Sequence, residues 1–140
     1  MKNSFLLFAL KCSIICYFAA CTNTEDFVVS KTVASVVKSG DWKVNLYLAS
    51  SNDQTNDFAG YKFTFSEGGI LKVNKTGNPE IMGSWFEDEI NKVLLINLGN
   101  ADPVLAKLNE SWNISILNET VVGLESNTAH GSEKLNISNQ

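Results

Sequence analysis

The sequence predicts an all-β fold: a small antiparallel up-and-down β-barrel of about eight strands with one short helical turn, after an N-terminal signal segment. Three observations support this. Apolar and polar residues alternate over short runs within residues 40–140. Turn-forming residues such as Gly68-Gly69 separate these runs. The pattern Gly-x-Trp occurs twice, at Gly40-Asp41-Trp42 at the start of the first expected strand and at Gly83-Ser84-Trp85 within the expected strand 81–87.

The composition fits one globular domain and argues against nucleic acid as a partner. The chain has 140 residues, of which 44% are hydrophobic. Its net charge is -4, and every basic side chain is a lysine. Without arginine the chain cannot clamp phosphate with two parallel hydrogen bonds, and phosphate contacts dominate nucleic-acid affinity.

Residues 1–21 have the pattern of an export signal. Lys2 precedes an apolar run that Lys11 interrupts and that ends in Phe18-Ala19-Ala20-Cys21. A cysteine directly after two alanines resembles the lipobox of bacterial lipoproteins, which implies that Cys21 carries an acyl chain such as palmitate and becomes the mature N-terminus. The alternatives are an ordinary cleaved signal or a single membrane span.

The other cysteines agree with this interpretation. Cys12 and Cys16 lie within the signal, so no cysteine follows Cys21 and no disulfide framework is available. Thr22 after the cysteine, by resemblance to Gram-negative lipoprotein sorting, implies the outer membrane. Glu25-Asp26 resembles an acidic signal for display on the cell surface, so either the periplasmic face or the cell surface is expected.

Residues 22–39 are expected to form a tether and a short helix. Thr22 to Asp26 are polar, and the valines of residues 27–38 have a partly helical spacing. A helix ending near Gly40 is predicted, although β-branched residues also allow a strand or a loop.

The barrel domain is expected to span residues 40–140. In its first strand Trp42 and Val44, together with Leu46 and Leu48, alternate with polar positions and are expected to face the core. The sixth expected strand alternates in the same way at Trp112, Ile114 and Ile116. The largely apolar run at residues 92–98 predicts burial on both faces. The expected strands cover residues 42–48, 61–65, 70–74, 81–87, 92–98, 112–116, 120–124 and 134–137.

The connections are also predicted. Asp102-Pro103 has the cap and first-position residues of a helical turn, with Leu105 and Leu108 facing the barrel. Residues 49–60 are expected to form a polar loop, residues 87–89 an acidic turn, and residues 126–132 a flexible loop that contains His130.

The order of these motifs resembles a known family. They are Gly40-Asp41-Trp42-Lys43-Val44, an Asp/Thr-rich loop, Phe58-Ala59-Gly60-Tyr61-Lys62-Phe63-Thr64-Phe65, Gly68-Gly69, Gly83-Ser84-Trp85, Leu105 to Leu108, Asn109-Glu110-Ser111-Trp112 and Leu135-Asn136-Ile137. Over residues 39–138 the chain is similar to the small lipocalin-like lipoproteins of Gram-negative bacteria. The resemblance implies a lipocalin-like barrel and a lipid anchor. The chain is shorter than classical lipocalins and lacks the arginine that packs across their first tryptophan.

The sequence lacks the residues that several kinds of functional site require. One histidine and no domain cysteine predict no metal site, no catalytic residue and no cofactor. Asp53-x-Thr55-x-Asp57 resembles a calcium loop, but Phe58 stands where the loop requires glycine. Glu87, Asp88 and Glu89 are expected to be a solvated turn rather than an acid/base pair. Five Asn-x-Ser/Thr sequons begin at Asn74, Asn109, Asn113, Asn118 and Asn136; in a bacterial lipoprotein they arise by chance.

The expected function is therefore binding and not catalysis. A lipid-anchored barrel, expected to be a monomer, would contact an unknown protein or glycan through its open end and loops. These loops include the polar loop of residues 50–56 and the acidic turn of residues 87–89, and the acidic balance favours a neutral or basic partner surface. The alternative is a carrier of a small apolar ligand inside the barrel. The aromatic residues decide between the two, because a shallow barrel is filled if they point inward. They are Trp42, Phe63, Phe65, Trp85 and Trp112.

Overall fold

A computed structural model describes residues 30–100, 102–128 and 131–140, and it is all-β as predicted. Eight antiparallel strands follow one another around a closed barrel, because the first strand also pairs with the last. The strands are β1 (Trp42–Ala49), β3 (Tyr61–Ser66), β4 (Ile70–Lys75), β5 (Ile81–Asp88), β6 (Val93–Asn97), β7 (Ser111–Leu117), β8 (Val121–Thr128) and β9 (Gly131–Asn139). A two-residue strand, β2 (Asn52–Asp53), extends the end of β1.

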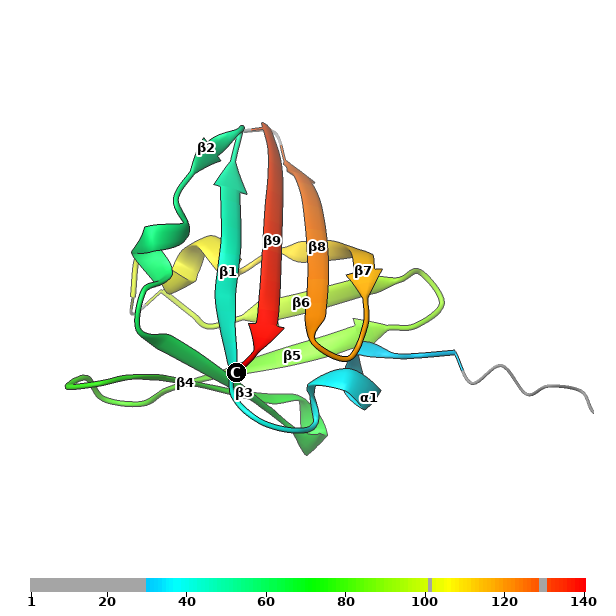
Figure 1. Ribbon diagram of the computed structural model, residues 1–140, viewed down its shortest axis with the longest axis horizontal. Helices are drawn as coiled ribbons and strands as arrows, with labels where there is room; N and C mark the ends of the chain where they lie inside the picture. The colour runs from blue at the N-terminus through cyan, green and yellow to red at the C-terminus, as the bar shows by residue number, and fades with distance from the viewer. Residues whose placement is uncertain (1–29, 101, 129–130) are drawn as a thin grey trace, which may run out of the picture.

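The barrel closes more tightly on one side of β1 than on the other. β1 pairs with β9 along its whole length, from Trp42 opposite Asn139 to Ala49 opposite Glu133. With β3 it shares a single pair, Trp42 opposite Phe63. Figure 1 shows the consequence: β7, β8, β9 and β1 form one half of the barrel, which crosses the strands of the other half at a steep angle.

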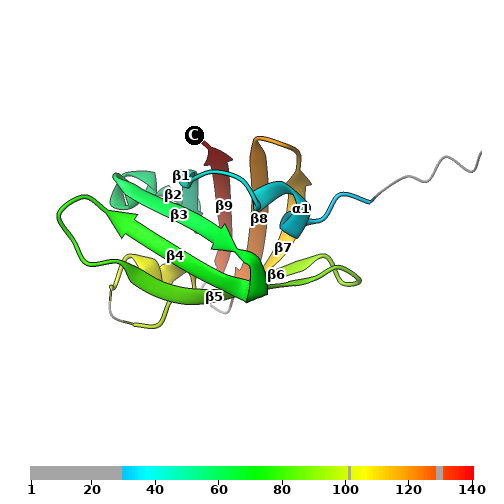
Figure 2. The same cartoon turned by 90° about the horizontal axis from the view of Figure 1, so that it is seen from below.

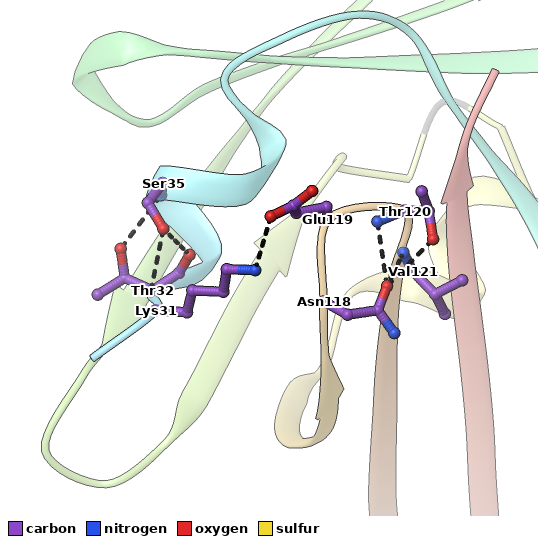
Figure 3. Close-up of polar contacts among 7 residues, drawn as sticks. All are labelled: Lys31, Thr32, Ser35, Asn118, Glu119, Thr120 and Val121. Carbon is purple, nitrogen blue, oxygen red and sulfur yellow. Dashed lines mark hydrogen bonds and ion pairs between the residues drawn. The ribbon is translucent and has the colours of Figure 1, made fainter. Parts of the chain in front are cut away.

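The short helix predicted before the barrel is present as α1 (Val33–Val37). Thr32 caps it, since its hydroxyl accepts the backbone N–H of Ser35 while the Ser35 hydroxyl accepts that of Thr32 (Figure 3). Lys31 also pairs with Glu119 in the turn between β7 and β8, at 3.1 Å (Figure 3). α1 therefore lies across the end of the barrel that faces the viewer in Figure 2.

Side chains from α1 and from the strands fill the inside of the barrel. Val33 and Val37 are fully buried in the same cluster as Trp42 and Trp112, whose exposed fractions are also 0%. Tyr47 packs edge-on against Phe58 with ring centroids 5.1 Å apart. The aromatic residues were expected to fill the barrel, and four of the five do so; Trp85 is only half-buried, at the end of the barrel next to α1.

The predicted alternation of β1 holds only for its first half. Val44 lies opposite Ile137 and Leu46 opposite Asn136, so one extra residue, Asn45, is inserted in β1. This β-bulge reverses the faces of the residues that follow. Tyr47 is therefore buried where Leu48 was expected to be, and the prediction for Leu46 and Leu48 is wrong.

A second bulge corrects the prediction for β7. Ile114 lies opposite Leu124 and Ile116 opposite Gly123, which leaves Ser115 as the extra residue. Trp112 is buried as predicted, but Ile116 is exposed on the outside of the barrel.

Three other sequence predictions are also corrected. β6 is not buried on both faces, because Leu94 and Ile96 point inward while Leu95 is exposed. The described residues of the loop expected at 126–132 belong to strands, since β8 runs to Thr128 and β9 begins at Gly131. Residues 49–60 contain β2 and a 3-10 turn, η1 (Thr55–Phe58).

Two further 3-10 turns are η2 (Glu67–Gly69) and η3 (Leu105–Leu108). The predicted cap of the second is confirmed, because Asp102 Oδ1 accepts the backbone N–H groups of Val104 and Leu105. Leu105 and Leu108 are buried against the barrel as expected.

Candidate functional site

Several of the residues singled out in the sequence lie outside the described part of the chain. They are the signal segment of residues 1–21 with the expected lipid attachment site Cys21, the expected tether from Thr22 to Asp26, and His130. The structure therefore bears on the surface of the barrel and not on the expected anchor.

The acidic residues of the loop after β1 are occupied by contacts within the domain. Asp53 Oδ1 accepts the backbone N–H of Thr55 at 2.9 Å, and hydrogen bonds from Thr55 lower the pKa of Asp53. Asp57 pairs with Lys107 at 2.6 Å. The two carboxylates thus hold separate partners and do not converge as calcium ligands would.

The three residues of the acidic turn, residues 87–89, have different roles. Glu87 accepts the first backbone N–H groups of α1, from Val33 at 2.8 Å and Ala34 at 2.9 Å. Asp88 holds the turn after β5 by accepting from Asn91, which lowers the pKa of Asp88. Within the described structure, Glu89 has no hydrogen bond or ion pair and is exposed.

Two sequon asparagines have structural roles. Asn109 Oδ1 accepts the N–H of Leu98 at 2.6 Å, and its amide nitrogen donates to the carbonyl of Gly99 at 2.7 Å. Asn118 Oδ1 accepts the N–H groups of Thr120 and Val121 in the β7–β8 turn (Figure 3). These two amides are thus used to shape connections.

The outer surface of β4, β5 and β6 carries an exposed apolar face. Phe86 lies directly opposite Leu95, so their side chains share the outer side of the sheet. Met82 on β5 and Ile70 on β4 project from the same side. We call these four residues, Ile70, Met82, Phe86 and Leu95, the apolar face; their exposed fractions run from 40% to 63%. Ser84 lies among them on the same side of β5. Several large apolar side chains exposed on one side of a sheet make that side a candidate interaction site.

Two hollows adjoin this face. The first, the mouth groove, has a volume of about 330 Å³ and lies between α1, η2 and β5, with Trp85 and Glu87 in its lining. The second, the face hollow, has a volume of about 440 Å³ and lies between η2 and the outer side of β5 and β6, with Phe86 and Leu95 in its lining. Gly68, Gly69, Trp85 and Phe86 line both, so the two hollows are neighbours.

Trp85 and the glycine turn give this site its shape. The Trp85 indole N–H donates to the carbonyl of Ser66 at 3.1 Å, and its ring packs edge-on against Phe65. A side chain on Gly69 would come within 2.8 Å of the Trp85 carbonyl oxygen, and Gly69 has a φ of +76°. Glycine is therefore needed for the turn to lie this close to β5.

Sequence reasoning found the Gly-x-Trp motif of β5 but missed the apolar face. Gly83-Ser84-Trp85 was singled out, whereas Met82, Phe86 and Leu95 were assigned no role. A signal was available: alternation along β5 places Met82 and Phe86 on the side opposite Trp85, which leaves them exposed if Trp85 points inward.

A third cavity, of about 320 Å³, lies at the other end of the barrel, with Val73, Pro79 and Ile81 in its lining. Tyr61 donates its hydroxyl hydrogen bond to Asp102 there, and Lys75 lies 4.2 Å from the centroid of the Tyr61 ring. Burial, helped by this hydrogen bond, raises the pKa of Tyr61 to about 12. Burial opposes ionisation of Asp102, but the hydrogen bonds it accepts outweigh this and lower its pKa.

Other classes of site have little support in the described residues. No group of three or more His, Cys, Asp or Glu side chains comes together there in a way that could hold a metal ion. No helix among these residues has the length and apolar character needed to span a bilayer.

The fold and the site define a small closed β-barrel with a filled interior and a hollowed apolar outer face. No family model matches the chain, and no curated protein matches its sequence. Among solved structures, the fold is similar to that of a DUF4847 family protein from Bacteroides vulgatus ATCC 8482, with a TM-score of 0.57. The two are 16% identical over 78% of this chain and 98% of that chain, a likeness that concerns the fold alone.

Proposed function

We propose that the chain is a lipid-anchored binding module of the bacterial cell envelope, held in the outer membrane by an acyl chain on Cys21. It acts by binding and not by catalysis, and it is a monomer. The sequence supports the anchor through Phe18-Ala19-Ala20-Cys21. The binding role depends above all on the exposed apolar face of β4, β5 and β6, next to a barrel whose interior is already filled.

The site of binding differs from the one that the loops suggested. Asp53 and Asp57 of the long loop are engaged with Thr55 and Lys107, so they have little to offer a partner. The face hollow offers a concave surface with Phe86 beside it, and partly exposed aromatic residues in pockets dominate binding energy at protein interfaces.

A carrier of a small apolar ligand is the second candidate. It is favoured by the cavity at the far end of the barrel, where Val73 and Ile81 provide an apolar lining. Such a ligand would sit in the barrel mouth, because the described core residues leave the interior packed.

Cys21→Ala tests the anchor. The variant cannot accept the acyl chain, so we expect it to remain unprocessed or to become soluble in the periplasm, whereas the parent fractionates with the outer membrane. Intact-mass measurement of the parent should show the acyl group. A parent protein that is soluble and has no acyl mass would contradict the anchor.

Photo-crosslinking tests the binding face. We expect a photoreactive phenylalanine analogue at position 86 of the anchored protein to give a discrete crosslinked product in cells. The matched control is the same analogue at position 116, because Ile116 is also exposed but lies on β7, outside the apolar face. Equal products from both positions, or none from position 86, would count against this face.

A further inference from the structure

The lining of the mouth groove combines aromatic and acidic side chains. Phe65 and Trp85 lie in its lining together with the carboxylates of Glu67, Glu87 and Glu89, against the single ammonium group of Lys38. Glu87 is occupied by the backbone of α1. Glu67 and Glu89 remain available to a partner.

The two available carboxylates are nearly unpaired. The side chain of Glu67 is 88% exposed, and its one ion pair, with Lys38, is 3.9 Å long. Exposed pairs of this kind contribute little and are readily exchanged. Glu89 is exposed and, within the described structure, has no ion pair or hydrogen bond. Beyond it in the same turn, Ile90 is 92% exposed.

This charge distinguishes between three possible occupants of the apolar face. A second copy of the chain would form a two-fold symmetric contact, which brings Glu67 and Glu89 of one copy towards those of the other. A bilayer surface with anionic lipids would repel the same carboxylates. A polypeptide with lysine or arginine beside an apolar residue matches both features at once.

We infer that the mouth groove and the face hollow together bind a basic polypeptide segment of another protein. An apolar side chain of this segment sits in the hollow beside Phe86, and flanking lysine or arginine side chains pair with Glu67 and Glu89. The inference rests on the proposed function, because it names the partner of the same apolar face.

Tryptophan fluorescence can measure this binding. Trp42 and Trp112 are fully buried, whereas Trp85 lines both hollows, so a bound segment should change the emission of Trp85 alone. The probe is a short synthetic peptide of leucine flanked by lysine, added to the full chain in detergent. Two comparison peptides carry glutamate in place of lysine, or serine in place of leucine. Trp85→Phe should remove the signal.

We expect the lysine–leucine peptide to bind and both comparison peptides to bind far more weakly. The double change Glu67→Lys and Glu89→Lys should weaken binding about tenfold, and added salt should weaken it too. Phe86→Ser should weaken it roughly 30-fold. Glu80→Lys, a charge reversal in the exposed turn between β4 and β5, and Ile116→Ser are the matched controls and should change nothing.

The outcomes separate the inference from the proposed function. If the glutamate–leucine peptide binds as well as the lysine–leucine peptide and Phe86→Ser weakens both, the apolar face stands and the basic partner is wrong. If no leucine-bearing peptide changes the emission of Trp85 at millimolar concentration, both are wrong. Binding to phosphatidylethanolamine–phosphatidylglycerol vesicles that depends on Phe86 would mean that the occupant of the apolar face is a membrane and not a basic segment. Dimers in sedimentation that depend on Phe86 would mean that the occupant is a second copy of the chain.

Discussion

Replacing Trp42 with alanine is expected to lower the free energy of unfolding by about 3–5 kcal/mol. Trp42 has an exposed fraction of 0%. Within β1 it is the residue that lies opposite both a β3 residue, Phe63, and a β9 residue, Asn139. A domain of this size has a total stability of only ~5–15 kcal/mol, so the variant could fail to fold. Denaturant midpoints of the variant and the parent measure the difference, and coinciding midpoints would contradict the filled core.

A comparison of two tryptophans refines this prediction. The indole N–H of Trp112 donates to the carbonyl of Leu108 at 3.1 Å, whereas that of Trp42 has no partner among the described residues. A buried N–H group without a partner is unfavourable, so removing the indole N–H of Trp42 removes a cost. Removing the indole N–H of Trp112 instead leaves the buried carbonyl of Leu108 without its donor. We therefore expect Trp42→Phe to destabilise the protein less than Trp112→Phe in the same denaturant series.

Replacing Gly83 with alanine is expected to destabilise the protein by about 1–3 kcal/mol, and replacing it with valine by more. A Cβ at this position would lie 2.4 Å from the carbonyl oxygen of Asn97 and 2.7 Å from Leu98 Cδ2. Because the nearest atom belongs to the backbone of β6, the two strands would have to separate at this point. Thermal unfolding measures the loss.

Ser84→Ala is the control for Gly83, since Ser84 lies next to it on the exposed side of β5. We expect this change to stay within about 0.5 kcal/mol of the parent. If Gly83→Ala were as stable as Ser84→Ala, the close approach of β5 and β6 would be wrong.

The two Gly-x-Trp motifs show why a sequence pattern can locate a strand without explaining it. Gly40 has a φ of +83°, and a Cβ there would lie 2.9 Å from Asn139 Oδ1. Gly40 therefore serves the turn into β1, whereas Gly83 serves the contact between β5 and β6. Both motifs begin with glycine, but only the three-dimensional neighbours reveal the two reasons.

Much of the fold could be predicted because its signals are local. Alternation located the strands, and Asp102-Pro103 located the turn at η3. The bulges at Asn45 and Ser115 were not predictable, because each depends on the register with a neighbouring strand. In the sequence both residues occupy ordinary polar positions of an alternating run, and both shifts changed which side chains face the core.

The candidate site was less predictable than the fold. Phe86 and Leu95 lie side by side only because β5 and β6 pair in one particular register. The mouth groove forms only because α1 packs against Glu87, which is far from α1 in the sequence. The loop carboxylates looked available because sequence does not reveal that Lys107 reaches Asp57. Exposure and pairing are properties of the folded chain, and they moved the expected binding site from the loop after β1 to the outer side of the sheet and the turns beside it.

The position at which a small apolar molecule binds is the most direct test of whether this barrel binds its partners on its outer surface. The measurement is the methyl NMR spectrum of the full chain during titration with benzene, which enters apolar cavities wherever they exist. Leu124 and Leu135 face each other inside the barrel with exposed fractions of 0%, while Met82 and Leu95 belong to the apolar face. We expect shifts at Met82 and Leu95 and none at Leu124 and Leu135. Shifts at Leu124 and Leu135 instead would mean that the interior is open, and the carrier would replace the outer-face binding module.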